Sequence, residues 1–408
     1  MTNNNAYQDK VHTTSTIAIV VIFIYFLMVM RCWLGFGGRT QMMTYAFPFL
    51  IFGLYAIGKL RLLFKRRYVI YAFIVFFFNV MGVRSGSNIN AYIYQLFLPT
   101  NILLVLCIPD DEKDYVLSKL IKWFGSIMFI GVLIYLANLV VDLPSLGVIK
   151  SDYGNLDISA GYFKNYIAYI KPLSDSTYSF LRFNGPFIEP GDLGCTAAFM
   201  LMAAKFDFKR YDKLIWILIA LIVSMSLAGY LLTIIAYFFV LFSQKKISKM
   251  TMIVTIICLF GIYFFGTFYN GGDNVFNEAI LSRLQSDEET GFSGNNRNSL
   301  LQTQYFLNMF SDPQTLWFGY DARTIEYLNE TGLGAGFVNK ALNVGMFGMI
   351  GLILPYLYIA LTSSSKKYAW LFFVFFLLYM YQRSESTWIC YIICYVYGIV
   401  INERRLTK

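Results

Sequence analysis

The residue types with the most potential for chemistry lie in one short segment, Arg182-Phe183-Asn184-Gly185-Pro186-Phe187-Ile188-Glu189-Pro190-Gly191-Asp192. The segment stands at the start of an apolar run, where ionisable side chains are costly unless they are paired or solvated. The planar guanidinium of Arg182 matches the oxygens of a phosphate or diphosphate group. An arginine at such a rim can equally anchor the end of a helix, and the residues alone favour neither interpretation.

Glu189 and its neighbours combine a carboxylate with turn residues that leave the backbone little freedom. Because Glu189 precedes Pro190 at the predicted start of a helix, the helix dipole favours it there as a cap. It is also placed to act as a general base for a hydroxyl group. The prolines and glycines of the segment predict a rigid shelf rather than a mobile linker. We take Arg182 and Glu189 as catalytic candidates, and Asn184, Gly185 and Pro190 as substrate-binding candidates.

A second arginine, Arg297, follows a glycine and two asparagines and precedes a helical pattern that begins at Leu300. A cation near a helix start opposes the helix dipole, so an anionic ligand would explain its position. A solvated loop arginine is the alternative. We include Arg297 among the catalytic candidates, as a second contact for an anionic group.

The last candidates lie where the chain enters its next long apolar run. Asn339, Lys340 and Asn343 lie on or near one helix face by their spacing. We take Asn339 and Lys340 as binding candidates for an anionic headgroup. Close packing against another helix is predicted for three glycines, Gly345, Gly348 and Gly351.

The composition excludes a soluble protein. Of the 408 residues, 57% are hydrophobic and 14% are charged, and the mean hydropathy is +0.55. A soluble domain carries about 25% charged residues. Because apolar runs long enough to cross about 30 Å of hydrocarbon recur along the chain, we predict one all-α polytopic membrane domain over residues 1–408.

Metal, cofactor and nucleic-acid chemistry find no support in the sequence. The one histidine, His12, lies in the polar N-terminal tail, so no multi-histidine metal site and no histidine base in the apolar body are expected. The cysteines lie in or beside apolar runs and are interpreted as helix-packing residues. No phosphate loop, nucleophile elbow or dinucleotide fingerprint occurs. The net charge of +9 reflects basic residues that sort to one side of a membrane, not nucleic-acid binding.

The apolar runs predict about twelve membrane-spanning helices. They lie near residues 15–31, 43–60, 68–83, 91–108, 120–141, 190–206, 213–226, 229–243, 250–269, 337–362, 367–382 and 387–403. The loop with Lys59, Arg61, Lys65, Arg66 and Arg67 is the strongest cytoplasmic signal. With this loop inside, most other lysines and arginines also fall inside, and both termini are cytoplasmic.

The run 213–243 tests this topology because basic loops flank it at both ends. One crossing would place one of these loops outside, whereas two short crossings keep both inside. We predict the break at Ser224-Met225-Ser226-Leu227-Ala228-Gly229, where small residues interrupt the apolar pattern. Broken helices often line a binding cavity. A single long tilted helix is the alternative.

Two long polar segments, about 142–189 and 270–336, fall outside the membrane in this topology. Loops of this length that are not linkers usually carry function. The candidate residues lie in or beside these two segments. Arg383 and Glu385 share the last short external turn, where we expect them to be solvated or paired with each other.

The string RFNGPFIEPGDLG, residues 182–194, resembles the Arg-x-x-Gly-x-Phe-x-Glu-Pro signature of the O-antigen polymerase and ligase superfamily, which includes the Wzy-type polymerases. The order of later parts also matches over most of the chain. These parts are a helix pair broken at a Ser-x-x-Gly element, Ser226 to Gly229, then a large external loop with Arg297, then a loosely spaced helix entry from Asn339 to Gly351. The first motif is fairly specific, and the later ones are informative through their order.

This resemblance implies an inverting, metal-independent membrane glycosyltransferase without a cofactor. Its substrates would be polyprenyl-diphosphate-linked oligosaccharide repeat units at the outer face of the bacterial plasma membrane. Arg182 and Arg297 match arginines assigned to the diphosphate, and Glu189 matches the motif glutamate. The expected partners are the lipid-linked donor and acceptor and membrane lipid, with a chain-length regulator protein as a further candidate.

Two departures from the family pattern bear on the choice within the superfamily. Many relatives carry Ser-Arg at the helix break, whereas here Leu227 follows Ser226 and leaves one cation fewer for the substrate. In the ligase branch a histidine precedes the late asparagine, whereas here Val338 precedes Asn339. We therefore predict a polymerase for a surface polysaccharide such as O-antigen, capsule or exopolysaccharide. The alternatives are a ligase-type transferase and a flippase for the same lipid-linked oligosaccharide, which about twelve helices would suit equally well.

Overall fold

The computed structural model describes residues 13–81, 89–151, 161–173, 182–245, 300–331, 336–383 and 385–407, with short stretches between 264 and 292. The α-helices in chain order are α1 (Thr16–Val29), α2 (Arg39–Ala56), α3 (Arg66–Met81), α4 (Ile89–Leu106), α5 (Lys113–Val140), α6 (Pro190–Ala204), α7 (Leu214–Ser224), α8 (Leu227–Ser243), α10 (Leu300–Asn308), α11 (Pro313–Phe318), α12 (Ala322–Thr331), α13 (Phe337–Thr362), α14 (Lys366–Gln382) and α15 (Ile389–Leu406). Short 3-10 helices are η1 (Trp33–Gly35), η2 (Tyr269–Gly272) and η5 (Met309–Ser311). The strands are β1 (Val148–Lys150), β2 (Tyr162–Asn165), β3 (Ile170–Pro172), β4 (Ser286–Asp287) and β5 (Gly291–Phe292).

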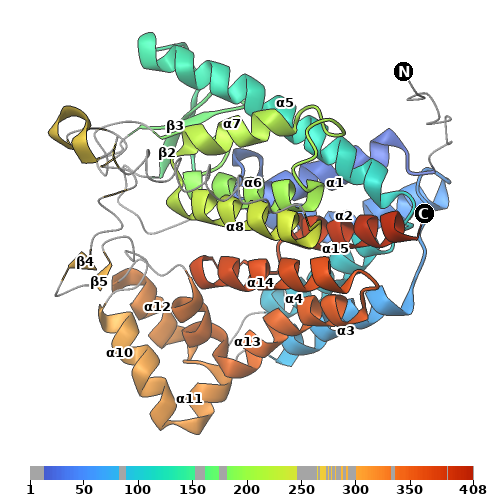
Figure 1. Ribbon diagram of the computed structural model, residues 1–408. Helices are drawn as coiled ribbons and strands as arrows, with labels where there is room; N and C mark the ends of the chain where they lie inside the picture. The colour runs from blue at the N-terminus through green and yellow to red at the C-terminus, as the bar shows by residue number, and fades with distance from the viewer. Residues whose placement is uncertain are drawn as a thin grey trace, which may run out of the picture.

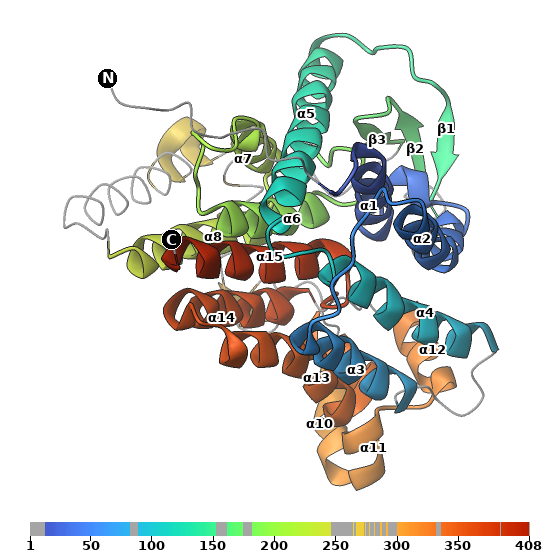
Figure 2. The same ribbon diagram turned by 90° about the vertical axis from the view of Figure 1, so that its right-hand side faces the viewer.

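Two buried helices, α6 and α15, form the centre of the molecule (Figure 1, Figure 2). Every residue from Asp192 to Ala204 in α6 and from Ile389 to Asn402 in α15 is buried. A helix that is apolar on all faces requires neighbours on all sides. Helices α1, α4, α5 and α14 pack around α15, while α7 and α8 pack against α6.

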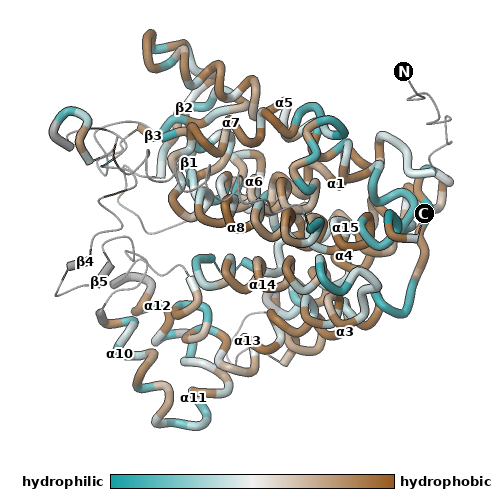
Figure 3. Tube along the Cα trace, viewed as in Figure 1, coloured by the Kyte–Doolittle hydropathy of each residue, from teal (hydrophilic) through white to brown (hydrophobic). Residues whose placement is uncertain are grey.

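The outer helices are largely hydrophobic along their length (Figure 3), and many of their large apolar side chains are exposed. On α5, Ile130, Leu133 and Leu139 are about half exposed, and Phe49 on α2 is 70% exposed. Extended apolar surface of this kind marks contact with lipid or with another protein. Two described helices, α5 and α13, are long and apolar enough to cross a membrane by length and composition.

The mostly helical fold is confirmed, and each predicted helix range except 250–269 has an observed helix at the same place. The range 250–269 lies almost entirely outside the described residues. The largest difference is at α5, which begins at Lys113 rather than near 120. Its polar first turns were outside the apolar run, but Lys113 is buried there and bonded to the carbonyls of Leu106 (2.9 Å) and Ile108 (2.6 Å). The number of membrane crossings stays a prediction.

The predicted break in the run 213–243 is confirmed. Helix α7 ends at Ser224, Met225 adopts a left-handed φ of 48°, and the hydroxyl of Ser226 caps α8 by accepting from the amide of Gly229 at 3.2 Å. A Cβ atom added to Gly229 would lie 2.8 Å from the Cα of Gly194. The glycine of the Ser-x-x-Gly element therefore lets α8 meet the backbone of α6.

The two long polar segments have secondary structure of their own. The first forms an antiparallel sheet in the order β1-β2-β3. In the second, α11 packs against α13, which is broken at Gly345 (φ 65°, ψ −178°). A Cβ at Gly345 would lie 2.4 Å from the carbonyl oxygen of Trp317, and one at Gly351 would lie 2.2 Å from Cβ of Phe78. Close packing against another segment is thus confirmed at Gly345 and Gly351, whereas a Cβ at Gly348 would meet Val344 of the same helix.

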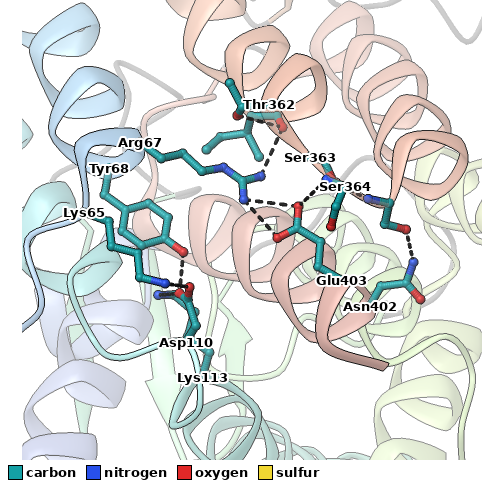
Figure 4. A network of polar contacts seen from close by, with 12 residues as sticks. Lys65, Arg67, Tyr68, Asp110, Lys113, Thr362, Ser363, Ser364, Asn402 and Glu403 are labelled. Carbon is teal, nitrogen blue, oxygen red and sulfur yellow. Dashed lines mark hydrogen bonds and ion pairs between the residues drawn. The ribbon is translucent and has the colours of Figure 1, made fainter. Parts of the chain in front are cut away.

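Residues from several of the predicted cytoplasmic basic loops meet in one network of polar contacts at one end of the molecule (Figure 4). Arg67, which opens α3, donates to both carboxylate oxygens of Glu403 on α15 at 3.1 and 3.0 Å. The amide of Ser364, before α14, donates to the same carboxylate at 3.2 Å. In Figure 1 this end is on the right and the strands lie on the left. The bundle thus has two distinct ends, and which of them is cytoplasmic stays a prediction.

Asp110, in the loop between α4 and α5, is the second centre of this polar end. It accepts hydrogen bonds from Tyr68 (2.5 Å) and Lys113 (2.7 Å), and it also pairs with Lys65. Burial by itself would raise the pKa of Asp110, but the charge of Lys113 and the three hydrogen bonds lower it to about 2. The lowered value means that the folded chain favours the ionised carboxylate.

This arrangement predicts acid sensitivity that depends on Asp110. Because the folded pKa is below the unfolded value, the carboxylate stabilises the fold above about pH 4, and this contribution disappears as the pH falls toward 2. The Asp110→Asn variant should be less stable at neutral pH by about 3 kcal/mol, since Lys113 stays buried without its countercharge. Melting temperatures measured against pH should show that the difference between the wild type and Asp110→Asn becomes smaller as the pH falls from about 4 toward 2. The exposed Asp212→Asn variant is the control, and an equal loss in both variants would contradict the assignment.

Candidate functional site

Arg182 lies at the break between α7 and α8. Its Nε donates to the carbonyl of Ser224 at 3.3 Å, and its Nη2 donates to the carbonyl of Met225 at 2.8 Å. The last carbonyls of a helix lack partners inside the helix and form the negative end of its dipole, so a cation is favoured there. The helix-anchoring role considered from the sequence is therefore observed. Contact of Arg182 with a phosphate group stays a prediction.

The turn after Arg182 is fixed on several sides. Asn184 is 1% exposed, and its side-chain amide donates to the carbonyl of Phe187 at 2.5 Å. Gly185 has a φ of +60° and its carbonyl accepts from the amide of Ile170 in β3 at 2.9 Å. The amide of Trp33 donates to the carbonyl of Pro186 at 3.1 Å. Asn184 and Gly185 therefore shape the site from inside the turn, and the predicted shelf ties the start of α6 to η1 and β3.

The side chain of Arg383 is bound by the start of α6, at residues 189–192. Nη2 of Arg383 lies 2.5 Å from Oε2 of Glu189, and its Nη1 bonds to Oδ1 of Asp192. Glu189 occupies the N-cap position of α6 without a capping hydrogen bond from its side chain, and Pro190 starts the helix. A Cβ at Gly191 would lie 2.2 Å from Nη2 of Arg383, so a side chain there would displace the guanidinium.

The prediction for the surroundings of Arg383 was wrong. The side chain was predicted to be solvated or paired with Glu385, but it is 2% exposed and pairs with Glu189 and Asp192 on α6. Glu385 instead pairs with Arg31 at 3.3 Å, and the guanidinium of Arg31 lies 5.4 Å from the ring centre of Trp388. We call Arg31, Glu189, Asp192, Arg383 and Glu385 the rim cluster.

Only Glu189 of the rim cluster was a candidate site residue from the sequence; the other four members, Arg31, Asp192, Arg383 and Glu385, were not. The available signal was a second carboxylate, Asp192, three residues after Glu189 in the first turn of a helix. Two adjacent carboxylates in apolar surroundings require a cation, because an unpaired buried charge is strongly unfavourable. The three carboxylates of the cluster differ in access to solvent: the side chain of Asp192 is fully buried, that of Glu385 is 16% exposed and that of Glu189 is 38% exposed.

Lys340 and Asn339 lie near the start of α13. The side-chain amide of Asn343 donates to the backbone carbonyl and the side-chain oxygen of Asn339 at 3.0 and 3.1 Å, which confirms a shared face for Asn339 and Asn343. Lys340 lines a cavity of about 260 Å³ between α3, α4, α13 and the α14–α15 turn. We call this space the α13 cavity. Ser386 and Thr387 of the same turn that carries Arg383 also line it, so one turn contributes to the cavity and to the rim cluster.

The structure thus places the predicted residues in three separate surroundings: Arg182 lies at the α7–α8 break, Glu189 belongs to the rim cluster and Lys340 lines the α13 cavity. Arg297 lies outside the described residues. Among the described residues, no group of three or more histidine, cysteine, aspartate or glutamate side chains is placed to hold a metal ion. No family model, no curated protein and no solved structure matches this chain.

Proposed function

We propose that this chain is a membrane polymerase that joins polyprenyl-diphosphate-linked oligosaccharide repeat units into a surface polysaccharide. The product would be an O-antigen, a capsule or an exopolysaccharide, made at the outer face of the plasma membrane. The observation that carries the proposal is the contact of Arg182 with the carbonyls of Ser224 and Met225. Through this contact Arg182, the first residue of the family-like signature, reaches the helix break directly before the Ser226–Gly229 element, across 42 to 43 residues of sequence.

The membrane part of the proposal has about twelve crossings and cytoplasmic termini. The apolar outer surface of the bundle and the apolar lengths of α5 and α13 support it. The basic loops gather at one end, where they would lie inside the cell under the positive-inside rule. The sheet β1-β2-β3 and the rim cluster would then lie at the outer end, where the lipid-linked substrates are exposed.

The proposed reaction forms one glycosidic bond and breaks one bond to the diphosphate. A hydroxyl oxygen of the acceptor attacks the anomeric carbon of the donor, the bond from that carbon to the diphosphate oxygen breaks, and the polyprenyl diphosphate leaves with the electron pair. Arg182 and Arg297 would hold the diphosphate and stabilise its charge as it leaves. Glu189, the exposed carboxylate of the rim cluster, would accept the proton of the hydroxyl.

The Arg182→Ala variant tests this proposal in cells that lack the native protein. Loss of a positioned cation should lower chain extension by about 10²–10³-fold, because the diphosphate loses a stabilising contact in the transition state. Gel analysis of surface polysaccharide should show single capped repeat units with the variant and long chains with the wild type. The Arg323→Ala variant, which changes an exposed arginine on α12, is the matched control and should restore long chains.

Other outcomes in cells without the protein would contradict a polymerase. Loss of all surface repeat units, with lipid-linked units accumulating inside, would indicate a flippase. Polymer of normal length left on its lipid carrier would indicate a ligase. Detergent-solubilised Arg182→Ala protein must also elute as a single folded species, since Arg182 bonds to the end of α7.

A further inference from the structure

The α13 cavity is lined by polar but mostly uncharged groups. Its amide and hydroxyl side chains come from three helices and one turn: Tyr71, Asn79, Tyr94, Gln95, Tyr356, Ser386 and Thr387. Phe78 and several aliphatic side chains complete the wall. A single water needs only about 10–15 Å³ of such space, so the roughly 260 Å³ here admit a larger guest. Apolar side chains combined with several placed polar groups are typical of a small-molecule site.

Three polar atoms at this cavity are buried without a hydrogen-bond partner within the described part of the chain. They are the hydroxyl oxygen of Tyr71, Oε1 of Gln95 and Oγ of Ser386, and the residue Ser386 is 1% exposed. Buried polar groups in folded proteins nearly always have partners, so such atoms call for a bound ligand or water. The three come from different elements, α3, α4 and the α14–α15 turn, and line the same space.

The charge of the cavity narrows the class of ligand. Lys340 is the one charged side chain among its described lining residues, and no carboxylate lines it. A lipid acyl chain would leave Gln95 and Ser386 unpaired, whereas a multiply charged anion would meet a single cation. A sugar ring suits the wall, because each hydroxyl donates and accepts and the C–H face of the ring packs against aromatic side chains such as Tyr94.

We propose that the α13 cavity binds one neutral sugar ring of an oligosaccharide, with ring hydroxyls bonded to Gln95 and Ser386. The assignment of this ring to a repeat unit rests on the proposed polymerase function. Because Ser386 and Arg383 belong to one turn, the bound ring lies beside the element that holds Glu189. The cavity then serves as a recognition subsite for one repeat unit.

Direct binding tests this inference without any polymerisation. The full chain is placed in lipid nanodiscs free of sugar detergents and titrated with methyl glycosides of the monosaccharides that acid hydrolysis releases from the cell's own surface polysaccharide. Saturation-transfer NMR should detect at least one of them. The Gln95→Met variant, which keeps the side-chain length but removes the amide, should weaken that binding about 10-fold. The Ser386→Ala variant, a smaller change, should weaken it in the same direction.

The matched control is Gln41→Met, the same replacement at an exposed position on α2. Binding that is equal to wild type in Gln41→Met and weaker in both cavity variants supports the site. If no glycoside binds to the wild type, or if Gln41→Met weakens binding as much as Gln95→Met, the inference is overturned. Polymer length in cells that lack the protein is a separate readout: unchanged polymer there defeats the polymerase proposal, while sugar binding sensitive to Gln95 still upholds the cavity.

Discussion

The Arg383→Ala variant is expected to lose about 3–5 kcal/mol of folding free energy, enough to abolish stable expression of many proteins. Arg383 is 2% exposed and provides the countercharge for Asp192, whose side chain is fully buried. Without the guanidinium, a carboxylate would remain at the N-terminus of α6 in surroundings closed to water. The loss should appear as a much lower melting temperature of the purified chain and a smaller folded fraction in size-exclusion chromatography.

The control for this prediction is Arg323→Ala, a change at an exposed position, which should have the same melting temperature as the wild type. A double variant, Asp192→Leu with Arg383→Met, should recover part of the lost stability, because the fully buried carboxylate is removed together with its cation. Glu189 also loses its ion pair with Arg383, but its side chain is 38% exposed and can be solvated. If the single Arg383→Ala variant has the same melting temperature as the wild type, the ion pair of Arg383 with Asp192 does not stabilise the fold.

The Glu189→Gln variant is expected to lower chain extension by about 10²–10⁴-fold, the usual contribution of a general base. Glu189 is the carboxylate of the rim cluster that a substrate can reach, since its side chain is 38% exposed. Its amide replacement keeps the shape and a hydrogen-bond acceptor but cannot take up a proton at neutral pH. Polymer formed per folded molecule, from purified lipid-linked repeat units, is the quantity to measure.

The Asp192→Asn variant is the comparison that separates chemistry from stability. Asp192 is fully buried and bonded to the same guanidinium, so its replacement should lower the melting temperature and leave more activity per folded molecule than Glu189→Gln. If the two variants lose activity in proportion to the folded protein that remains, Glu189 acts only as a structural partner of Arg383.

The segment from Glu189 to Asp192 has a second structural role in the rim cluster. The sequence interpretation treated its proline and glycine as parts of a rigid turn, but Gly191 also leaves the space that the guanidinium of Arg383 occupies. Glu189 is held by the same guanidinium at 2.5 Å. Arg383 is therefore a positioning residue for the proposed base, and the α14–α15 turn links that base to the α13 cavity.

The positions of the helices followed from the sequence because each depends on interactions between near neighbours. Apolar runs and their flanking charges located α1 to α8 and α13 to α15 to within several residues. The break after α7 was also predictable, since Ser226 caps α8 by a bond to Gly229 only three residues away. The glycines in α13 indicated close packing, though not against which partner.

What tertiary structure alone decided is which distant side chains meet. Arg383 reaches carboxylates that are 191 and 194 residues away in sequence, and Arg67 reaches Glu403 across 336 residues. A charge buried in the bundle is tolerated only with a partner, so the sequence by itself required that partners exist for Glu189 and Asp192. The packing of α6 between α8 and α15 determined that Arg383 is that partner, because it brings the end of α14 to the start of α6.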